Sequence, residues 1–141
     1  MFLAYFKLSE FDSKDIPGSG DRMRASTLLK CDALRENYGS PLVPSSGYRS
    51  PERNKAVGGV KNSSHLLGFA VDFKNITDEN LIKFLDASWD AGFRRFGIMT
   101  TAIHVDDDPS KTSPAIWDYD STPRSRMQAA KIWFTAKLKE A

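Results

Sequence analysis

The amino-acid sequence predicts an α+β fold, a small antiparallel sheet flanked by helices. Several segments carry apolar residues at every third or fourth position, the period of an amphipathic helix, and they stop at a glycine or start at a proline. Short runs rich in β-branched and aromatic residues, typical of strands, occur at 69–73, 95–98 and 102–106. Because no linker or repeat divides the 141 residues, we expect one domain over residues 1–141.

The first helix is expected from Asp21, which can cap it, to about Tyr38. A short apolar opening segment and a loop with proline and glycine breakers precede it. Gly39 is placed to end the helix. Its buried positions recur at spacings of three and four: Met23, Thr27, Cys31, Leu34 and Tyr38. The single cysteine excludes an internal disulfide, and we expect a buried, unreactive thiol there.

Residues 41–46 carry two prolines and are expected to be extended, because proline disrupts a helix interior. Gly47 allows a sharp turn after them. Ser50 and Pro51 then mark the start of a short helix, which the glycine pair at 58–59 ends. A polar loop leads from there to the strand predicted over 69–73.

A turn over residues 75–78 comes next, with Thr77 or Asp78 as the cap of a further helix that Gly92 stops. The apolar face of this helix is formed by Leu81, Leu85, Ser88 and Trp89. The strands predicted over 95–98 and 102–106 follow directly and are joined by a three-residue connection.

Residues 107–122 are expected to form a polar loop, after which Pro123 opens the last helix. The buried stripe of this helix is predicted to consist of Met127, Ala130, Phe134 and Leu138. Its other surface is expected to be basic, with Arg124, Arg126, Lys131, Lys137 and Lys139. Such a helix can lean on anionic lipid or wall polymer, or simply dock with one solvated face.

Composition excludes two classes of partner. A formal net charge of +2 without a basic stripe does not indicate nucleic-acid binding. No apolar run approaches the roughly 20 residues that span a bilayer. The apolar start of the chain lacks the basic region and cleavage site of a signal peptide. We therefore expect a protein made in the cytoplasm, without a membrane span, that acts as a monomer.

The two histidines stand beside the features of a metal site. His65, Asp72 and His104 would supply two imidazoles and a carboxylate, and leave a fourth position of a zinc ion open. In one straight strand, residues 65 and 72 would lie about 23 Å apart at ~3.3 Å per residue. The chain must therefore fold back between them, and Gly68 would allow the turn.

Other interpretations remain open on spacing alone. A single histidine is more often a surface or satisfied core group than a ligand, and the generic HExxH pattern of zinc proteases is absent. His104, between Ile103 and Val105, is equally compatible with the polar face of an ordinary strand.

The segment SSHLLGFAVD at residues 63–72 resembles the S-x-H-x-x-G-x-A-x-D signature of the LAS metallopeptidases. This group comprises zinc D-Ala-D-Ala carboxypeptidases and dipeptidases, phage L-alanyl-D-glutamate endopeptidases and the zinc-bearing hedgehog domain. The segment SGYRS at 46–50 resembles the upstream block of the carboxypeptidase branch, and IHVD at 103–106 resembles its downstream metal motif. The similarity extends over about residues 6–117 and implies a hedgehog/DD-peptidase-like fold.

The resemblance implies one Zn²⁺ held by His65, Asp72 and His104, and hydrolysis of an amide by water that the ion activates. Arg49 resembles the substrate-facing arginine of the group, whose guanidinium suits a carboxylate or an oxyanion. Ser63 would lie beside the substrate. Tyr48 and Trp117 would flank a binding groove, although packing is the ordinary role of such aromatics.

The general base is where the sequence departs from the group. Many members carry an acidic residue or a histidine two or three positions before the last metal histidine, where this chain has Thr101 and Ala102. Asp106 is the best local substitute, since it lies on the same strand face as His104. Asp107 and Asp108 are next, although an acidic run is usually a solvated turn.

We therefore predict a zinc metallopeptidase that cleaves peptidoglycan stem peptides, as a D-Ala-D-Ala carboxypeptidase or an endopeptidase. Small size and the missing signal peptide fit a phage endolysin that reaches the cell wall after holin-assisted release. The alternative is a module that contains zinc without catalysing a reaction, as the hedgehog domain does. Such a module would bind peptidoglycan or belong to a phage structure. If Asp106 is the base, Asp106→Asn should keep zinc and lose most turnover.

Overall fold

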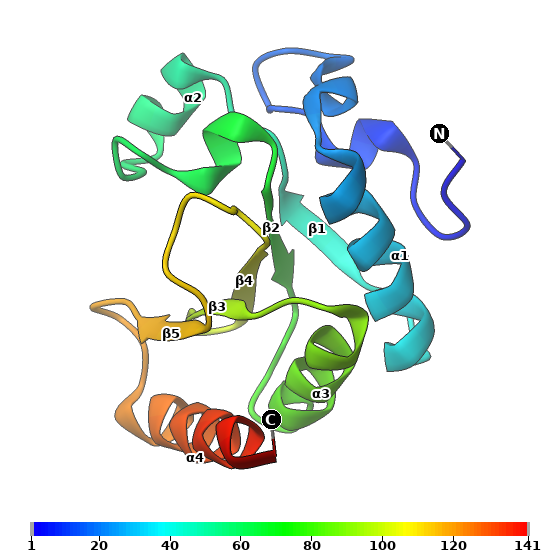
Figure 1. Cartoon of the computed structure of the whole chain (residues 1–141). Coiled ribbons are helices and arrows are strands. Elements are labelled where there is room, and N and C mark those ends of the chain that lie inside the picture. The colour runs from blue at the N-terminus through cyan, green and yellow to red at the C-terminus, as the bar shows by residue number, and fades with distance from the viewer. Residues whose placement is uncertain (1, 141) are drawn as a thin grey trace.

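The computed structural model describes residues 2–140 and has an α+β fold built on one five-stranded sheet (Figure 1). The strands follow the order β1-β2-β4-β3-β5, and every pair is antiparallel except β3 with β5. Their bounds are Val43–Ser46 (β1), Ala70–Lys74 (β2), Arg95–Ile98 (β3), Ala102–Asp106 (β4) and Ala115–Asp118 (β5). The predicted fold class is therefore confirmed.

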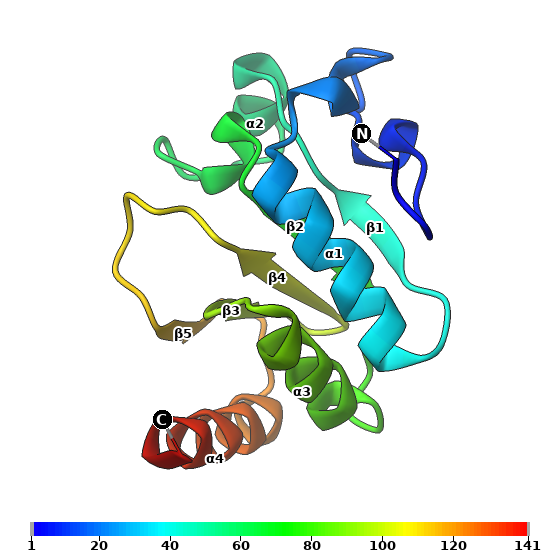
Figure 2. The ribbon, with the colours of Figure 1, turned by 45° about the vertical axis from the view of Figure 1, so that its right-hand side comes forward.

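Residues 2–140 contain four α-helices: α1 (Ala25–Tyr38), α2 (Pro51–Ala56), α3 (Leu81–Ala91) and α4 (Arg124–Glu140). α1 and α3 lie side by side along one face of the sheet (Figure 2). α4 packs against α3 and against β3 and β5. The described residues also form three 3₁₀ turns, at Leu8–Phe11, Ser19–Arg22 and Ser64–Leu67. No helix within residues 2–140 has the length and apolar character needed to cross a membrane.

The two faces of the sheet differ in chemistry because side chains alternate along each strand. Phe73 on β2 is fully buried, and its ring centroid lies 5.8 Å from that of Phe84 on α3. On β4, Ile103 and Val105 are likewise fully buried in the core. The residues between these positions, Asp72 and His104, therefore point to the opposite face, which the helices leave open.

One row of paired residues crosses all five strands on this open face. The pairs join Ser46 to Asp72, Asp72 to His104, His104 to Gly97, and Gly97 to Trp117. In the neighbouring row, Asp106 pairs with Arg95. Residues from five separate stretches of the sequence are thus aligned by backbone register alone.

Several sequence expectations hold. The strands over 95–98 and 102–106 have the predicted bounds. Gly39 and Gly92 end α1 and α3 in the left-handed conformation, with φ of 79° and 108°. The hydroxyl of Ser50 caps α2 by accepting from the backbone N–H of Arg53.

Other expectations are wrong. α1 begins at Ala25 rather than at Asp21, because Asp21 belongs to a separate 3₁₀ turn. The N-terminal boundary of α3 is Asn80, without a side-chain cap, rather than Thr77 or Asp78. Residues 107–122 are not loop throughout, since they contain β5.

The predicted faces of α4 also need correction. Trp133 is buried, whereas Leu138 is 43% exposed. Arg126 is 2% exposed, not part of the basic surface. Its guanidinium donates to the carbonyl oxygens of Met99 (2.7 Å) and Ile76 (2.6 Å) and to the carboxylate of Asp78 (2.9 Å). Arg126 therefore ties α4 to two turns of the sheet layer.

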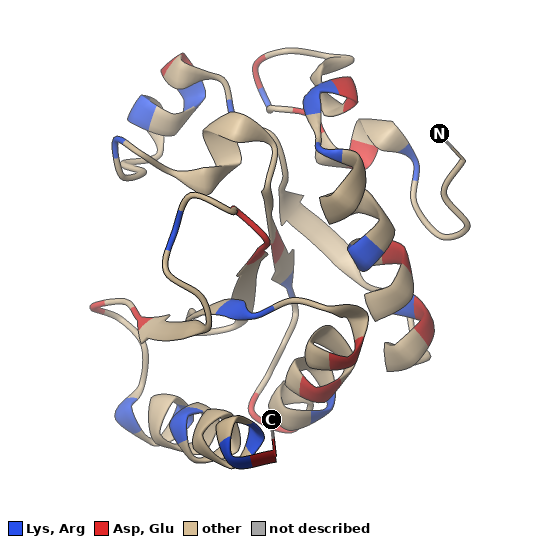
Figure 3. Ribbon diagram, in the orientation of Figure 1, with Lys and Arg blue, Asp and Glu red and all other residues tan. Residues whose placement is uncertain are grey.

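The remaining charges of α4 conform to the expectation. Figure 3 shows lysine and arginine along α4 and acidic residues on the neighbouring α3. Lys137 of α4 lies 3.3 Å from the Asp86 carboxylate of α3, and Trp133 donates its indole N–H to the same aspartate at 2.8 Å. One of the basic residues of α4, Lys137, thus helps to hold this helix against α3.

Candidate metal centre

Three side chains of metal-ligating type converge on the open face of the sheet. Asp72 and His104 are directly paired on β2 and β4, and His65 comes from the 3₁₀ turn at Ser64–Leu67. One ligand atom from each residue lies within 4.8 Å of the other two, and all three residues are buried. The sequence motif and the fold therefore bring the predicted group together.

The fold-back between His65 and Asp72 takes place at Gly68, as expected. Gly68 adopts a φ of 78°, which favours glycine. A Cβ atom there would also lie 2.3 Å from the carbonyl oxygen of Arg22, so there is no room for a side chain. This turn places the His65 imidazole beside the strand that carries Asp72.

The hydrogen bonds of both imidazoles fix which nitrogen faces Asp72. His65 Nδ1 lies 2.7 Å from the carbonyl oxygen of Gly47, which can only accept, so Nδ1 carries the hydrogen. His104 Nε2 lies 2.7 Å from the Asp106 carboxylate, which favours the hydrogen on Nε2. His65 Nε2 and His104 Nδ1 are then left with lone pairs, 3.2 and 3.0 Å from the same Asp72 oxygen.

Two lone pairs and an anionic oxygen repel one another unless a cation lies among them. Burial lowers the pKa of His65, which keeps that imidazole neutral. Burial opposes it, but the Asp106 and Asp72 carboxylates, which accept hydrogen bonds from the charged imidazole, raise the pKa of His104 to about 9. The pKa of Asp72 is lowered despite its burial, because both histidines favour the carboxylate. A proton on His104 satisfies the cluster alone, and a metal ion would replace that proton.

The donor set suits zinc. Two neutral imidazole nitrogens and one carboxylate oxygen are the ligands of many catalytic zinc sites, which keep a further position for water. Each histidine has its second nitrogen held by a carbonyl or a carboxylate, the arrangement that orients imidazole ligands. The residues present therefore fit a zinc ion.

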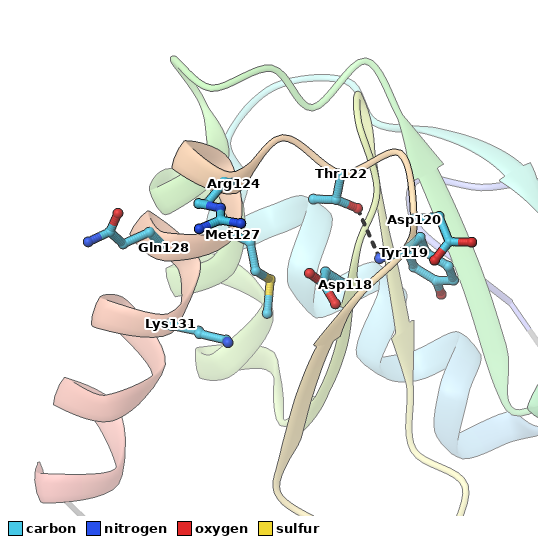
Figure 4. A pocket seen from close by; sticks show the side chains of 8 residues that line it. All are labelled: Asp118, Tyr119, Asp120, Thr122, Arg124, Met127, Gln128 and Lys131. Atoms are coloured by element: carbon cyan, nitrogen blue, oxygen red, sulfur yellow. Dashed lines mark hydrogen bonds between the residues drawn. The ribbon is translucent and has the colours of Figure 1, made fainter.

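An open cavity of about 550 Å³ gives access to this cluster, and its lining includes all three residues. A slightly larger hollow of about 600 Å³ lies between the end of β5 and α4 (Figure 4). Neither histidine lines that second hollow. We place the functional site in the first cavity because the ligand-type atoms converge there.

A protein-family model described as Peptidase M15 matches residues 4–106. The chain belongs to the peptidase M15 family. Members of this family are zinc-dependent and resemble D-Ala-D-Ala carboxypeptidases, which confirms the suspected resemblance. A comparison with curated proteins finds no match.

In this M15 chain, Arg49 lies at the metal cluster. Its guanidinium donates to Ser46 Oγ (3.1 Å), Asn54 Oδ1 (3.2 Å) and the second oxygen of Asp72 (3.3 Å). An arginine side chain has five N–H groups, so two remain after these three bonds. Arg49 therefore holds the Asp72 carboxylate and, within residues 2–140, keeps two N–H groups that these bonds do not use.

Of two other residues predicted to bind substrate, Ser63 lines the cavity at the metal cluster and Tyr48 does not. The Ser63 hydroxyl accepts from the backbone N–H of His65 (3.2 Å). Tyr48 does not reach this cavity. Its ring is buried, and its hydroxyl accepts from Arg22 (3.1 Å). The structure therefore favours packing as the role of Tyr48.

The three aspartates after His104 are all engaged. Asp106 is 1% exposed and accepts from His104, from Arg95 Nε (2.8 Å) and from the backbone N–H of Asp108 (3.2 Å). Asp107 accepts from Thr27 and from Lys30 Nζ (3.0 Å). Asp108 accepts from Ser64 Oγ (2.8 Å). None of the three is the solvated turn residue that an acidic run usually provides.

Trp117 lines the cavity, with its ring centroid 5.4 Å from that of His104. The cavity also contains residues that the sequence did not single out: Arg95, Lys111 and Tyr119. Arg95 is paired with Asp106 and lies over the Trp117 ring, 4.9 Å from its centroid. Tyr119 directly follows β5, in a segment that the sequence predicted as loop, so no strand period pointed to it.

Proposed function

We propose that this chain is a zinc peptidase that hydrolyses peptide bonds in the stem peptides of bacterial peptidoglycan. The observation that carries the proposal is the convergence of His65 Nε2, His104 Nδ1 and an Asp72 oxygen at an open cavity. A zinc ion held there would polarise the scissile carbonyl and lower the pKa of water to about 7.

Charge in the cavity supports a substrate that carries carboxylates. Arg49 retains two N–H donors, and Lys111 lines the same cavity. Stem peptides have free carboxylates along the chain and at the terminal D-alanine. Arginine binds carboxylates through two parallel hydrogen bonds, so Arg49 would hold such a group while Asp72 fixes the guanidinium from behind.

For Asp106 we propose a positioning role in place of the predicted role as general base. Its carboxylate is fully buried and accepts from three donors, one of which is the ligand His104. A group so engaged holds an imidazole in one tautomer and orientation. It is poorly placed to take a proton from water in the cavity.

This arrangement also supports a second candidate, a zinc-containing module that binds peptidoglycan without cleaving it. Among residues 2–140, the carboxylates that line the cavity are Asp72 and Asp106. Both are committed to the histidines and arginines around them. A peptidase with this cavity must therefore rely on a group other than a free carboxylate to assist the proton transfers.

Digestion of purified peptidoglycan separates the two candidates. Wild type, His65→Ala and the distant surface variant Lys139→Ala would each be loaded with zinc, and the released muropeptides identified by mass spectrometry. We expect products from wild type and Lys139→Ala, and none from His65→Ala. Free D-alanine would identify a carboxypeptidase, and shortened stems an endopeptidase. Zinc-loaded wild type that binds peptidoglycan and releases nothing would be the non-catalytic module.

We further propose an endolysin as the biological setting. Expression in the bacterial cytoplasm should then lyse cells only when a holin is co-expressed, and His65→Ala should abolish that lysis. Unchanged growth with the holin present would exclude this role while leaving the peptidase proposal in place.

A further inference from the structure

The hydroxyl of Tyr119 has a free hydrogen at the metal cavity. Trp117 Nε1 lies 3.1 Å from this hydroxyl, and an indole N–H can only donate, so Tyr119 is the acceptor. Within residues 2–140, the Tyr119 hydroxyl donates no hydrogen bond. Because Tyr119 lines the same cavity as His65 and His104, its hydrogen is available to a molecule bound there.

The backbone around Tyr119 is held to the sheet. Thr122 Oγ1 accepts from the Tyr119 N–H (3.0 Å, dashed in Figure 4) and donates to the carbonyl oxygen of Ile98 on β3 (2.6 Å). The Thr122 N–H in turn donates to the Tyr119 carbonyl at 3.0 Å. Figure 4 also shows Asp118 turned toward Met127 of α4 and Tyr119 turned away from it. Tyr119 lines both the hollow beside α4 and the metal cavity, and these bonds hold its backbone between the two.

Gly97 makes room for this hydroxyl. In the cross-strand row, Gly97 lies between His104 and Trp117. A Cβ atom on Gly97 would lie 2.6 Å from the Tyr119 hydroxyl oxygen and 2.8 Å from Trp117 Nε1. Both contacts are closer than real Cβ atoms make, so any side chain at this position would displace the two groups. The missing side chain leaves space for both groups, and the Trp117 ring centroid lies 5.4 Å from that of His104.

The hydroxyl is protonated at neutral pH. Tyr119 is 40% exposed, but partial desolvation of its hydroxyl, followed by the negative charges of Asp72 and Asp106, raises its pKa above the ordinary value. Tyr119 is therefore a neutral donor placed among the charges of the cavity. A donor fixed in advance is effective where negative charge develops during a reaction, since it needs no reorganisation.

We propose that Tyr119 is a catalytic residue, which donates its hydroxyl hydrogen bond to the carbonyl oxygen of the scissile amide as that oxygen becomes an oxyanion. The inference rests on the proposed peptidase function and adds a residue outside the segment that matches the M15 family. Trp117 is a positioning residue in this scheme, because it holds the hydroxyl oxygen and leaves the hydrogen free.

The test compares zinc-loaded wild type, Tyr119→Phe and the control Tyr5→Phe, which alters a tyrosine of similar exposure that lies against Arg35. Two quantities are measured: kcat and KM on a synthetic stem pentapeptide, and the affinity for a phosphinate analogue of the same peptide by calorimetry. Removing one such donor should lower kcat about 100–1,000-fold with KM nearly unchanged. Affinity for the phosphinate, which imitates the tetrahedral oxyanion, should fall at least about ten-fold.

The outcomes separate this inference from the proposed function. Equal kcat and equal phosphinate affinity in wild type and Tyr119→Phe would overturn the role of Tyr119 and leave the peptidase intact. Tyr119-dependent phosphinate binding in a wild type without turnover would support the donor and overturn the peptidase. Equal losses in Tyr119→Phe and Tyr5→Phe, or a wild type that neither turns over nor binds the phosphinate, would overturn the inference.

Discussion

His104 Nε2 lies 2.7 Å from the buried carboxylate of Asp106, and the other oxygen of that carboxylate accepts from Arg95 at 2.8 Å. The three groups form a chain along the open face of the sheet, from the metal cluster on β4 to Arg95 on β3. Because Asp106 and Arg95 are direct cross-strand neighbours, register alone positions this support. The ligand His104 is therefore oriented by the sheet itself.

Asp106→Asn tests whether this carboxylate orients a ligand or acts as a base. We expect zinc affinity to fall about 10–100-fold, because removal of such a partner weakens the hold on an imidazole ligand. If Asp106 only positions His104, turnover should return when zinc is raised to saturation. Competition with a chromophoric chelator measures the affinity, and peptidoglycan digestion measures the turnover. Unchanged zinc affinity together with lost turnover at saturation would instead restore Asp106 as the base.

Gly97→Ala should mimic the loss of Tyr119. The added methyl group would displace the Tyr119 hydroxyl and the Trp117 indole, and we expect kcat to fall about 100-fold. Zinc content should remain stoichiometric, because Gly97 donates no side-chain contact to the ligands. The double variant Gly97→Ala/Tyr119→Phe should be no slower than the slower single variant, since both remove one interaction. Multiplied losses in the double variant would contradict a shared cause.

Arg126→Met should destabilise the fold without altering the metal cluster. The change leaves the carbonyl oxygens of Ile76 and Met99 without a partner, at about 1–3 kcal/mol each. The ion pair with the 70%-exposed Asp78 adds little. Urea unfolding of zinc-loaded protein measures the difference, with the exposed Arg124→Met as the control, expected within about 0.5 kcal/mol of wild type. Equal free energies of unfolding for the two variants would show that the hydrogen bonds of Arg126 do not stabilise the fold.

Cys31 should be inert in the native protein. Burial, followed by the charges of Asp107 and Asp32, raises the pKa of its thiol well above the ordinary value. A thiol reagent at pH 8 should label it only as fast as the protein unfolds, and rapidly in urea. A raised pKa stabilises the fold below the ordinary pKa of a thiol, and this contribution is lost as the pH rises. Rapid labelling without denaturant would show that the residue is accessible.

Removal of metal should lower thermal stability and leave the secondary structure intact. A ligand at 1,000 times its Kd stabilises the folded state by about 4 kcal/mol, which chelation would remove. The sheet should persist, because a proton on His104 can satisfy the empty cluster. Thermal melts and far-UV circular dichroism measure the two effects. The melting temperature of His65→Ala should no longer respond to zinc, and a full response would place the ion elsewhere.

The sequence predicts the group of His65, Asp72 and His104 because short motifs record the local structure around each of them. The turn at Gly68 needs a glycine for both φ and space, and the motif records that need. The strands that carry Asp72 and His104 have apolar neighbours on alternate positions, so their period is visible. Glycines likewise mark the ends of α1 and α3.

The features that the sequence did not predict are β5, the burial of Arg126 and the position of Tyr119, and each depends on residues distant in the chain. β5 is a four-residue strand of partly exposed residues, and its pairing with β3 defines it. Arg126 has the character of a surface residue, and only the two backbone carbonyls that meet it explain its burial. Tyr119 acquires its position from Trp117 and from the space at Gly97.

The site can form only when the strands pair in their native register, because one cross-strand row supplies its residues: Ser46, Asp72, His104, Gly97 and Trp117. A slip of one residue in any strand would turn its site residue into the core and an apolar residue outward. Molecules that pair their strands wrongly during folding would therefore fail to capture metal. Selecting refolded molecules by their ability to bind zinc would accordingly enrich the fraction whose strands are in register.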